Sequence, residues 1–242
     1  MIKTILIAGA TVVCVAIAPA CGGGGSGGDR ESEATQRDIS NEELGRMLLA
    51  LDQFGPEFAQ FAAADDNGAL DLEQAAQEED DPNAERGDLQ QFGYASGNKA
   101  FYSHPAFEGS GVYYLGGVIY MFRAEDGASG YFSDSLDEIR KLDPSDPDVS
   151  FDTVATYDLD VADQSAGARI EGSVKRSNGS QVPIWGAVAY IRHGRLDGAL
   201  TMFGLNMSDA DKQRLEGKVK TLAADLNDRI TGALAGTAPP SP

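Results

Sequence analysis

Cysteine and histidine are scarce in this chain, and their scarcity excludes several kinds of site. The chain has two cysteines, Cys14 and Cys21, and both precede the first stretch with the pattern of a folded domain. The two histidines, His104 and His193, fall in a polar loop and in a tight turn by sequence pattern. A zinc site needs several nitrogen or sulfur ligands, so we expect the domain to contain no zinc site, disulfide or cysteine nucleophile.

Catalytic motifs are also missing. The chain contains no G-x-S-x-G elbow and no H-E-x-x-H pair. The glycines of GSGVYYLGG precede a strand pattern, whereas a phosphate-binding loop opens a helix, and EGKVKT lies inside a helical pattern. We therefore expect no catalytic residue, no bound metal and no cofactor.

Basic residues are few. Lys and Arg number 19 against 38 Asp and Glu, which gives a formal net charge of −19. Such a surface repels nucleic acid and anionic lipid headgroups, so we expect no nucleic-acid partner. Carboxylate pairs could in principle serve a hydrolase, but acidic side chains this numerous come close together by chance and mostly face solvent.

Two acidic segments resemble calcium sites in part. In AADDNGALDLEQ at 63–74, Asp65, Asn67 and Asp71 match part of a calcium loop, but Ala63 and Gln74 occupy its first and twelfth positions, where carboxylates are required. We expect a turn there and a short helix capped by Asp71. The second segment is DPSDPD at 143–148, whose prolines favour a turn over a binding site for its Asp143, Asp146 and Asp148.

Residues 1–20 have the pattern of a secretory signal peptide. Lys3 is followed by an uncharged run from Thr4 to Ala20. As a helix this run would span roughly 25 Å, which is short of the ~30 Å hydrocarbon core of a bilayer. A positive start, an apolar middle and small residues at the end are typical of an exported chain.

The segment Ala18-Pro19-Ala20-Cys21 resembles a lipobox, the cleavage motif of bacterial lipoproteins. The resemblance implies that Cys21 becomes the first residue, carries diacylglycerol on its sulfur and is further acylated, as with palmitate, so that the membrane is a partner through this lipid. Residues 21–38 begin CGGGGSGG and continue with charged residues, which predicts a flexible tether. Residues 39–236 are expected to form one domain, and 237–242 a disordered tail.

Hydrophobic patterning predicts an α+β fold. Strands are expected over 91–103, 111–122, 168–176, 181–192 and 195–204, with Asn178-Gly179 and His193-Gly194 as hairpin turns. Helices are expected from Ser40, whose capping box includes Glu43, to Gly55-Pro56, over EDGASGYFSDSLDEIRKL, and from Ser208 through Ala235. We expect an antiparallel sheet of about five to six strands with the helices packed on one face, including the long C-terminal helix.

The order of these features resembles that of a family of exported bacterial lipoproteins. The matching stretches include MLLALDQFGPEF, LQQFGYASG, VIYMFRAEDGASGYF, VADQSAGARIEG and WGAVAYIRHGRLDGAL. The layout is more loosely similar to the extracytoplasmic sensor domains of bacterial Ser/Thr kinases. The resemblance implies an exported α+β domain and provides no catalytic residues.

Aromatic residues give the one indication of a binding site. Six of them come from adjacent expected strands and the loop between them: Tyr102, Phe107, Tyr113, Tyr114, Tyr120 and Trp185. Most are expected in the core, and Tyr102, Phe107, Tyr113 and Trp185 are the candidates for an apolar or sugar-stacking pocket. The sequence thus favours a lipid-anchored, non-enzymatic domain outside the cytoplasmic membrane that binds a small ligand or an envelope partner. An envelope-directed hydrolase with dispersed carboxylates, or a purely structural envelope protein, are the alternatives.

Overall fold

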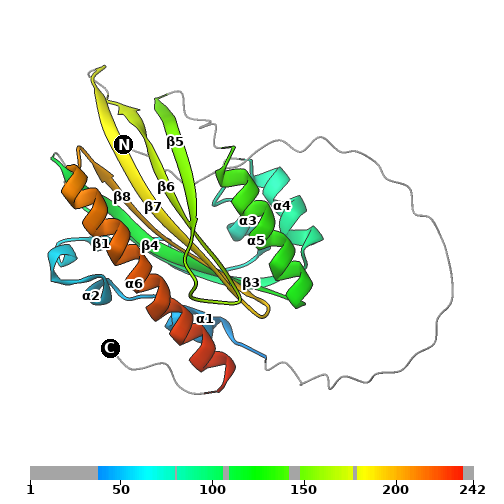
Figure 1. The fold of residues 1–242 in the computed structure, drawn as a ribbon. Helices are drawn as coiled ribbons and strands as arrows, with labels where there is room; N and C mark the ends of the chain where they lie inside the picture. Colours follow the sequence, from blue (N-terminus) through cyan, green and yellow to red (C-terminus); the bar gives the residue numbers. More distant parts are fainter. Residues whose placement is uncertain (1–37, 80, 106–108, 142–147, 177–178, 237–242) are drawn as a thin grey trace, which may run out of the picture.

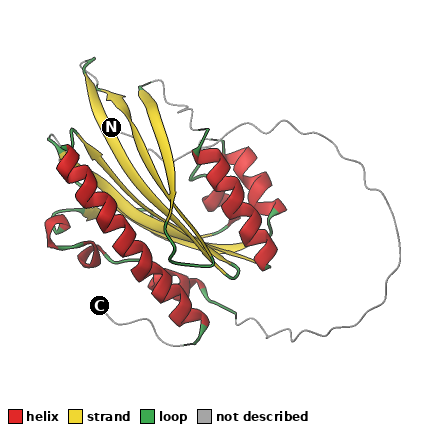
Figure 2. Ribbon diagram, viewed as in Figure 1, coloured by secondary structure: helices red, strands yellow, loops and turns green. Residues whose placement is uncertain are grey.

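The computed structural model describes residues 38–79, 81–105, 109–141, 148–176 and 179–236, in which helices flank one antiparallel sheet of eight strands (Figures 1 and 2). The helices are α1 (Asn41–Met47), α2 (Leu51–Phe54), the single 3-10 turn η1 (Pro56–Phe58), α3 (Leu72–Ala76), α4 (Pro82–Gln91), α5 (Glu125–Ile139) and α6 (Asp209–Leu234). The strands are β1 (Ala62–Ala63), β2 (Gly68–Leu70), β3 (Tyr94–Ser103), β4 (Gly111–Phe122), β5 (Val149–Asp158), β6 (Gln164–Lys175), β7 (Gln181–His193) and β8 (Leu196–Leu205).

The sheet runs in the order β1-β3-β4-β8-β7-β6-β5, and β2 also pairs with β3. Strands β6, β7 and β8 form the expected meander, and the turn between β7 and β8 contains Gly194 at φ 57°. Gly179 has the positive φ of 81° that a tight turn between β6 and β7 requires, while Asn178 lies outside the described residues.

The expected number of strands was too low. The additional strands are β1, β2 and β5. The first two have two and three residues, which is too short to show any periodicity. Strand β5 pairs on one side only, with β6, and most of its side chains are half-buried or exposed. An edge strand of this kind has little of the apolar alternation that marks a strand in a sequence.

The expectation that the helices pack on one face was also wrong, because they cover both. We call the two sides the α6 face and the α5 face of the sheet. On β7, Trp185 and Ala187 point to the α6 face and pack with α1 and α6, while Ile184 and Val188 point to the α5 face. Strands β4, β7 and β8 carry apolar side chains on both sides, so both sides need a cover.

Helix α6 supplies most of the cover of the α6 face (Figure 1). Ser208 caps it, since its side chain accepts a hydrogen bond from the amide of Asp211. Its buried stripe consists of Leu215, Val219, Leu222, Leu226 and Ile230. Full burial of each such side chain contributes roughly 1.5–3 kcal/mol, so this stripe fixes the helix to the sheet.

The N-terminal helical segment is divided where one helix was expected. The capping box of Ser40 and Glu43 is confirmed, but α1 ends at Met47 because Leu48 is extended. The chain becomes helical again in α2 and then turns at Gly55, where φ is 119°. Asp71 caps the short helix α3, as expected. No helix in the described ranges is long and apolar enough to cross a membrane.

Candidate ligand-binding cleft

The α5 face of the sheet is incompletely covered at its centre. Five side chains of the central strands β4, β7 and β8 are only half-buried there: Tyr114, Val118, Tyr190, Ala199 and Thr201. Their neighbours on the α6 face are at most 1% exposed: Leu115, Ile119, Ala189, Leu200 and Met202. Central strands are normally buried on both sides, so this difference marks a hollow between the sheet and the helices.

The hollow is a cleft with a cavity volume of about 100 Å³. Its floor is the sheet, and its walls come from α4, α5 and the residues after α3. The aromatic lining residues are Phe101, Tyr114, Tyr120, Tyr131, Tyr190 and Phe203. The acidic lining residues are Glu78, Glu79, Glu85, Glu138 and Asp197, and no lysine, arginine or histidine of the described ranges is among the lining residues. The cleft is therefore both aromatic and acidic.

Three buried polar atoms at the floor of the cleft have no hydrogen-bond partner in the described part of the chain. They are Oδ2 of Asp197, Oγ1 of Thr201 and the hydroxyl of Tyr114. Asp197 is the most buried of these residues, with 5% of its surface exposed. A buried polar atom that forms no hydrogen bond is costly, and its partner is often a bound molecule.

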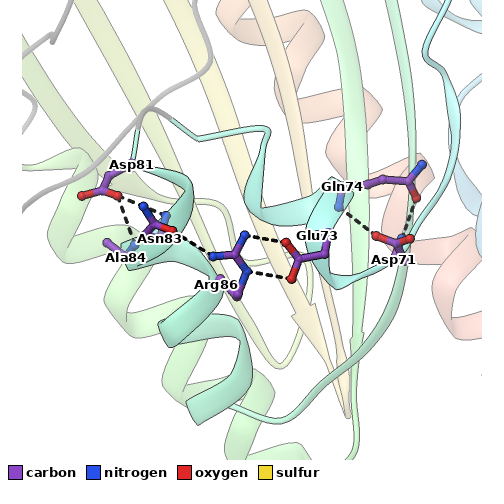
Figure 3. Close-up of polar contacts among 7 residues, drawn as sticks. All are labelled: Asp71, Glu73, Gln74, Asp81, Asn83, Ala84 and Arg86. Atoms are coloured by element: carbon purple, nitrogen blue, oxygen red, sulfur yellow. Dashed lines mark hydrogen bonds and ion pairs between the residues drawn. The ribbon is translucent and has the colours of Figure 1, made fainter.

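Polar contacts fix the helices beside the cleft (Figure 3). Asp71 and Gln74 form a capping box at α3, and the Asp81 side chain accepts hydrogen bonds from two amides at the start of α4. Arg86 of α4 donates two hydrogen bonds to the Glu73 carboxylate of α3, so the two helices are joined. These contacts orient the segment that carries Glu78, Glu79 and Glu85.

Lys99 adds a second anchor from the sheet. Its Nζ lies 2.6 Å from Oε1 of Glu78 and 2.7 Å from Oδ2 of Asp66. The Lys99 side chain is 4% exposed, and its ammonium group sits between these two carboxylates. One acidic group of the cleft, Glu78, is therefore already neutralised by a cation of the protein itself.

Two other carboxyls of the cleft hold protons more tightly than usual. Burial raises the pKa of Glu85 to about 7, although the Tyr131 hydroxyl, which donates to it at 3.0 Å, opposes this. Burial, together with the negative charges of Asp134 and Asp88, raises the pKa of Glu138 to about 7. Carboxyl oxygens of Asp88, Asp134 and Glu138 all lie within 4.8 Å of one another, so the three groups share a crowded acidic site between α4 and α5.

The residues proposed from sequence as a binding site lie elsewhere. Tyr102 and Trp185 point to the α6 face: Tyr102 stacks edge-on against Phe54, and Trp185 is 1% exposed in the core. Tyr113 packs against the core of the α5 face but does not line the cleft, and Phe107 and Cys21 lie outside the described residues. A binding role for these residues stays a prediction.

Of the six aromatic residues that the sequence grouped together, Tyr114 and Tyr120 line the cleft. Sequence reasoning missed Asp197, Thr201 and the helical acids. One signal was available: Asp197 interrupts an otherwise apolar strand in RLDGALTMFG, and a charged residue inside a central strand needs a reason. No sequence pattern indicated that α4 and α5 line the cleft, because this depends on which face of the sheet these helices cover.

Comparisons with known proteins identify no family. No family model and no curated protein matches this chain. Among solved structures, the extracellular domain of PknH from Mycobacterium tuberculosis matches with a TM-score of 0.46 and 11% sequence identity, covering 80% of this chain and 99% of that chain. At this level of similarity the function of the neighbour does not transfer to this chain.

Proposed function

We propose that this protein is a lipid-anchored, non-enzymatic binding protein that takes a small ligand in the cleft on its α5 face, outside the cytoplasmic membrane. The observation that carries the binding role is a group of buried polar atoms that have no hydrogen-bond partner among the described residues. They belong to Asp197, Thr201 and Tyr114, which line the cleft together with its aromatic rings. A ligand that donates hydrogen bonds would satisfy them and cover the rings. The location rests on the lipobox at Cys21 and the tether after it.

The binding role is tested by native mass spectrometry of the full-length protein, released from mild detergent. We expect one added mass per chain. The variant Ala199→Leu fills the floor of the cleft, because Ala199 lies on β8 and lines it, and should lose the added mass. Ala210→Leu, at an exposed position of α6, adds the same atoms away from the cleft and should keep it. A bare wild-type chain, or an added mass that survives in Ala199→Leu, would contradict the proposal.

An envelope-directed hydrolase is the second candidate, because one observation favours it. Hydrolases of glycosidic bonds need a carboxylic acid that stays protonated near neutral pH, and both Glu85 and Glu138 have pKa values raised to about 7. Glu78, held by Lys99, would be the second carboxyl group of the pair. The binding role is preferred because burial and crowding of negative charge raise these pKa values in any enclosed acidic cleft, without a reaction.

The hydrolase is tested by incubating the protein with polysaccharide from a bacterial envelope and measuring new reducing ends. Activity that is lost in Glu138→Gln and kept in Asp137→Asn would establish it, since Asp137 is on the same helix and its side chain is 61% exposed. No release of reducing ends by the wild-type protein leaves the binding role.

A further inference from the structure

We propose that the cleft selects an organic ammonium ion, meaning a positively charged amine nitrogen that carries compact apolar substituents. This inference rests on the proposed binding function and names the class of its ligand. It is carried by three features: the aromatic lining, the excess of carboxyl groups over basic groups, and the buried unpartnered oxygen of Asp197.

The aromatic lining suits a cation with an apolar body. The rings of Phe101 and Tyr114 stack with centroids 5.3 Å apart, and those of Tyr120 and Tyr131 meet edge to face at 5.8 Å. All four line the cleft. Ring faces carry partial negative charge and attract a cation, most strongly where water is excluded, and the same rings favour methyl and methylene groups.

The charges of the cleft disfavour an anion and leave room for a cation. Among the described lining residues, five are acidic and none is basic. Lys99 is not a lining residue, and its ion pairs in the described part of the chain are with Glu78 and Asp66. An anionic ligand would find no basic partner here and would oppose ionisation of these carboxyl groups, whereas a bound ammonium ion would favour their ionised form.

The carboxyl group of Asp197 would fix the position of the ligand's charged nitrogen in the cleft. Its Oδ2 lacks a partner in the described part of the chain, and only 5% of the residue is exposed. Arg192 is its cross-strand neighbour on β7, but Nη1 of Arg192 donates to the Gly194 carbonyl at 2.7 Å and Nη2 lies 3.9 Å from Asp163. Nε of Arg192 is also buried, and it forms no hydrogen bond with Asp197 or with any other described residue. A neutral apolar ligand would place neither a donor nor a charge beside this oxygen. A protonated amine would donate a hydrogen bond to it, and a quaternary ammonium ion would place its positive charge beside it.

Pairing would also release a proton. Burial raises the pKa of Asp197 well above its ordinary range, with Arg192 opposing, so this carboxyl holds its proton more tightly than an exposed aspartate does. A cation beside it favours the ionised form and displaces the proton. The titratable and charged groups of the surrounding elements are Arg192 and Tyr190 on β7, Tyr120 on β4, Tyr131 and Glu138 on α5, Glu85 on α4, and Glu78 and Glu79 after α3.

The test is isothermal titration calorimetry of the full-length protein with three probes of similar size. Choline carries the cation, 3,3-dimethylbutan-1-ol is its neutral isostere, and benzoate is an anion. We expect choline to bind at least roughly tenfold more tightly than the isostere, and benzoate to bind more weakly than both. Repeating the choline titration in buffers of different ionisation enthalpy should show proton release, which the neutral isostere should not cause.

Matched variants connect the selectivity to the carboxyl groups. Asp197→Asn should bring choline binding down towards the level of the isostere and reduce proton release, while leaving isostere binding unchanged. Glu138→Gln, at a more accessible position on α5, should weaken choline binding severalfold and serves as the second variant if Asp197→Asn does not fold. Asp137→Asn removes the same charge outside the cleft and should leave choline binding unchanged.

The outcomes separate this inference from the binding function itself. Equal binding of choline and its isostere, or selectivity that Asp197→Asn leaves intact, would overturn the ammonium ion and leave the cleft as a binding site. The ammonium ion would also be overturned if a neutral or anionic molecule copurified with the wild-type chain and was absent from Ala199→Leu. The cleft would again remain a binding site. If no probe binds and no added mass is found, both proposals fail.

Discussion

Glu85 is a buried acid with a measurable effect on stability. It is 8% exposed, and burial raises its pKa from 4.5 to about 7. In the unfolded chain the group ionises near pH 4.5, so between about pH 4.5 and 7 the folded state binds more protons than the unfolded state. Its contribution to stability is therefore lost as the pH rises through this window.

The variant Glu85→Gln removes this pH dependence and keeps an acceptor for the Tyr131 hydroxyl. We expect the free energy of unfolding of the variant, relative to wild type, to rise by roughly 2–3 kcal/mol between pH 5 and pH 8. Urea denaturation followed by circular dichroism at both pH values measures it. Glu42→Gln, at an exposed site on α1, is the control and should show no such rise. If Glu85→Gln and wild type differ in free energy of unfolding by the same amount at pH 5 and pH 8, the burial of this acid is contradicted.

At Gly116 the backbones of β3 and β4 lie unusually close together, as the sequence indicated. The pair Gly116-Gly117 inside an apolar strand predicts a bulge or a close backbone contact. In the structure Gly116 has φ +152°, and a Cβ there would lie 2.4 Å from the Ala100 carbonyl oxygen of the neighbouring strand. Because the obstructing atom belongs to the backbone of β3, no side-chain movement can relieve the contact.

Gly116→Ala should therefore lower the free energy of unfolding by roughly 3 kcal/mol. The measurement is urea denaturation, and the slope of the transition shows whether the variant still unfolds in one step. A loss below roughly 0.5 kcal/mol, the level of an ordinary surface substitution, would show that β3 and β4 do not approach each other as described.

At the scale of the element, α6 depends on its cap and its buried stripe more than on helix propensity. Gly217 lies exposed in its middle, and a Cβ there would meet no atom within 4 Å. Gly217→Ala should therefore stabilise the protein by roughly 0.5–1 kcal/mol. Ser208→Ala removes the side chain that caps the first turn and should destabilise it by about 1 kcal/mol. Thermal melts of the two variants should move in opposite directions, and movement in the same direction would contradict this description of the helix.

Elements with a strong local signal were predictable. The long apolar strand 111–122, the meander after residue 164, the caps at Ser40, Asp71 and Ser208, and the stripe of α6 all follow from short-range patterns. Strands β1 and β2 have no such pattern, since their pairing with β3 depends on where the chain runs after α2 and η1. The break between α1 and α2 arises from the extended backbone of Leu48, which no local residue type requires.

At the scale of the whole molecule, the cleft exists because the two faces of the sheet are covered differently. The α6 face meets one long helix and the N-terminal segment, which close it completely over β7 and β8. The α5 face meets shorter helices that leave Ala199 and Thr201 partly open. The central strands carry apolar side chains on both faces, so their sequences look alike towards either side. The sequence could therefore show that the strands are central without showing which side would remain open.

The whole molecule also includes the segment before Asp38, for which the resemblance of residues 18–21 to a lipobox makes a specific prediction. If Cys21 carries the lipid, Cys21→Ala should move the protein from the membrane fraction to the soluble fraction of the envelope, because several buried acyl chains are needed for stable attachment. Cys14→Ala is the matched control, as it removes the other cysteine of the chain and should leave the protein on the membrane. Immunoblots of fractionated cells measure both. Attachment that persists in Cys21→Ala would exclude the lipid anchor and would leave the ligand-binding cleft unaffected, since the cleft is built entirely from residues 78–203.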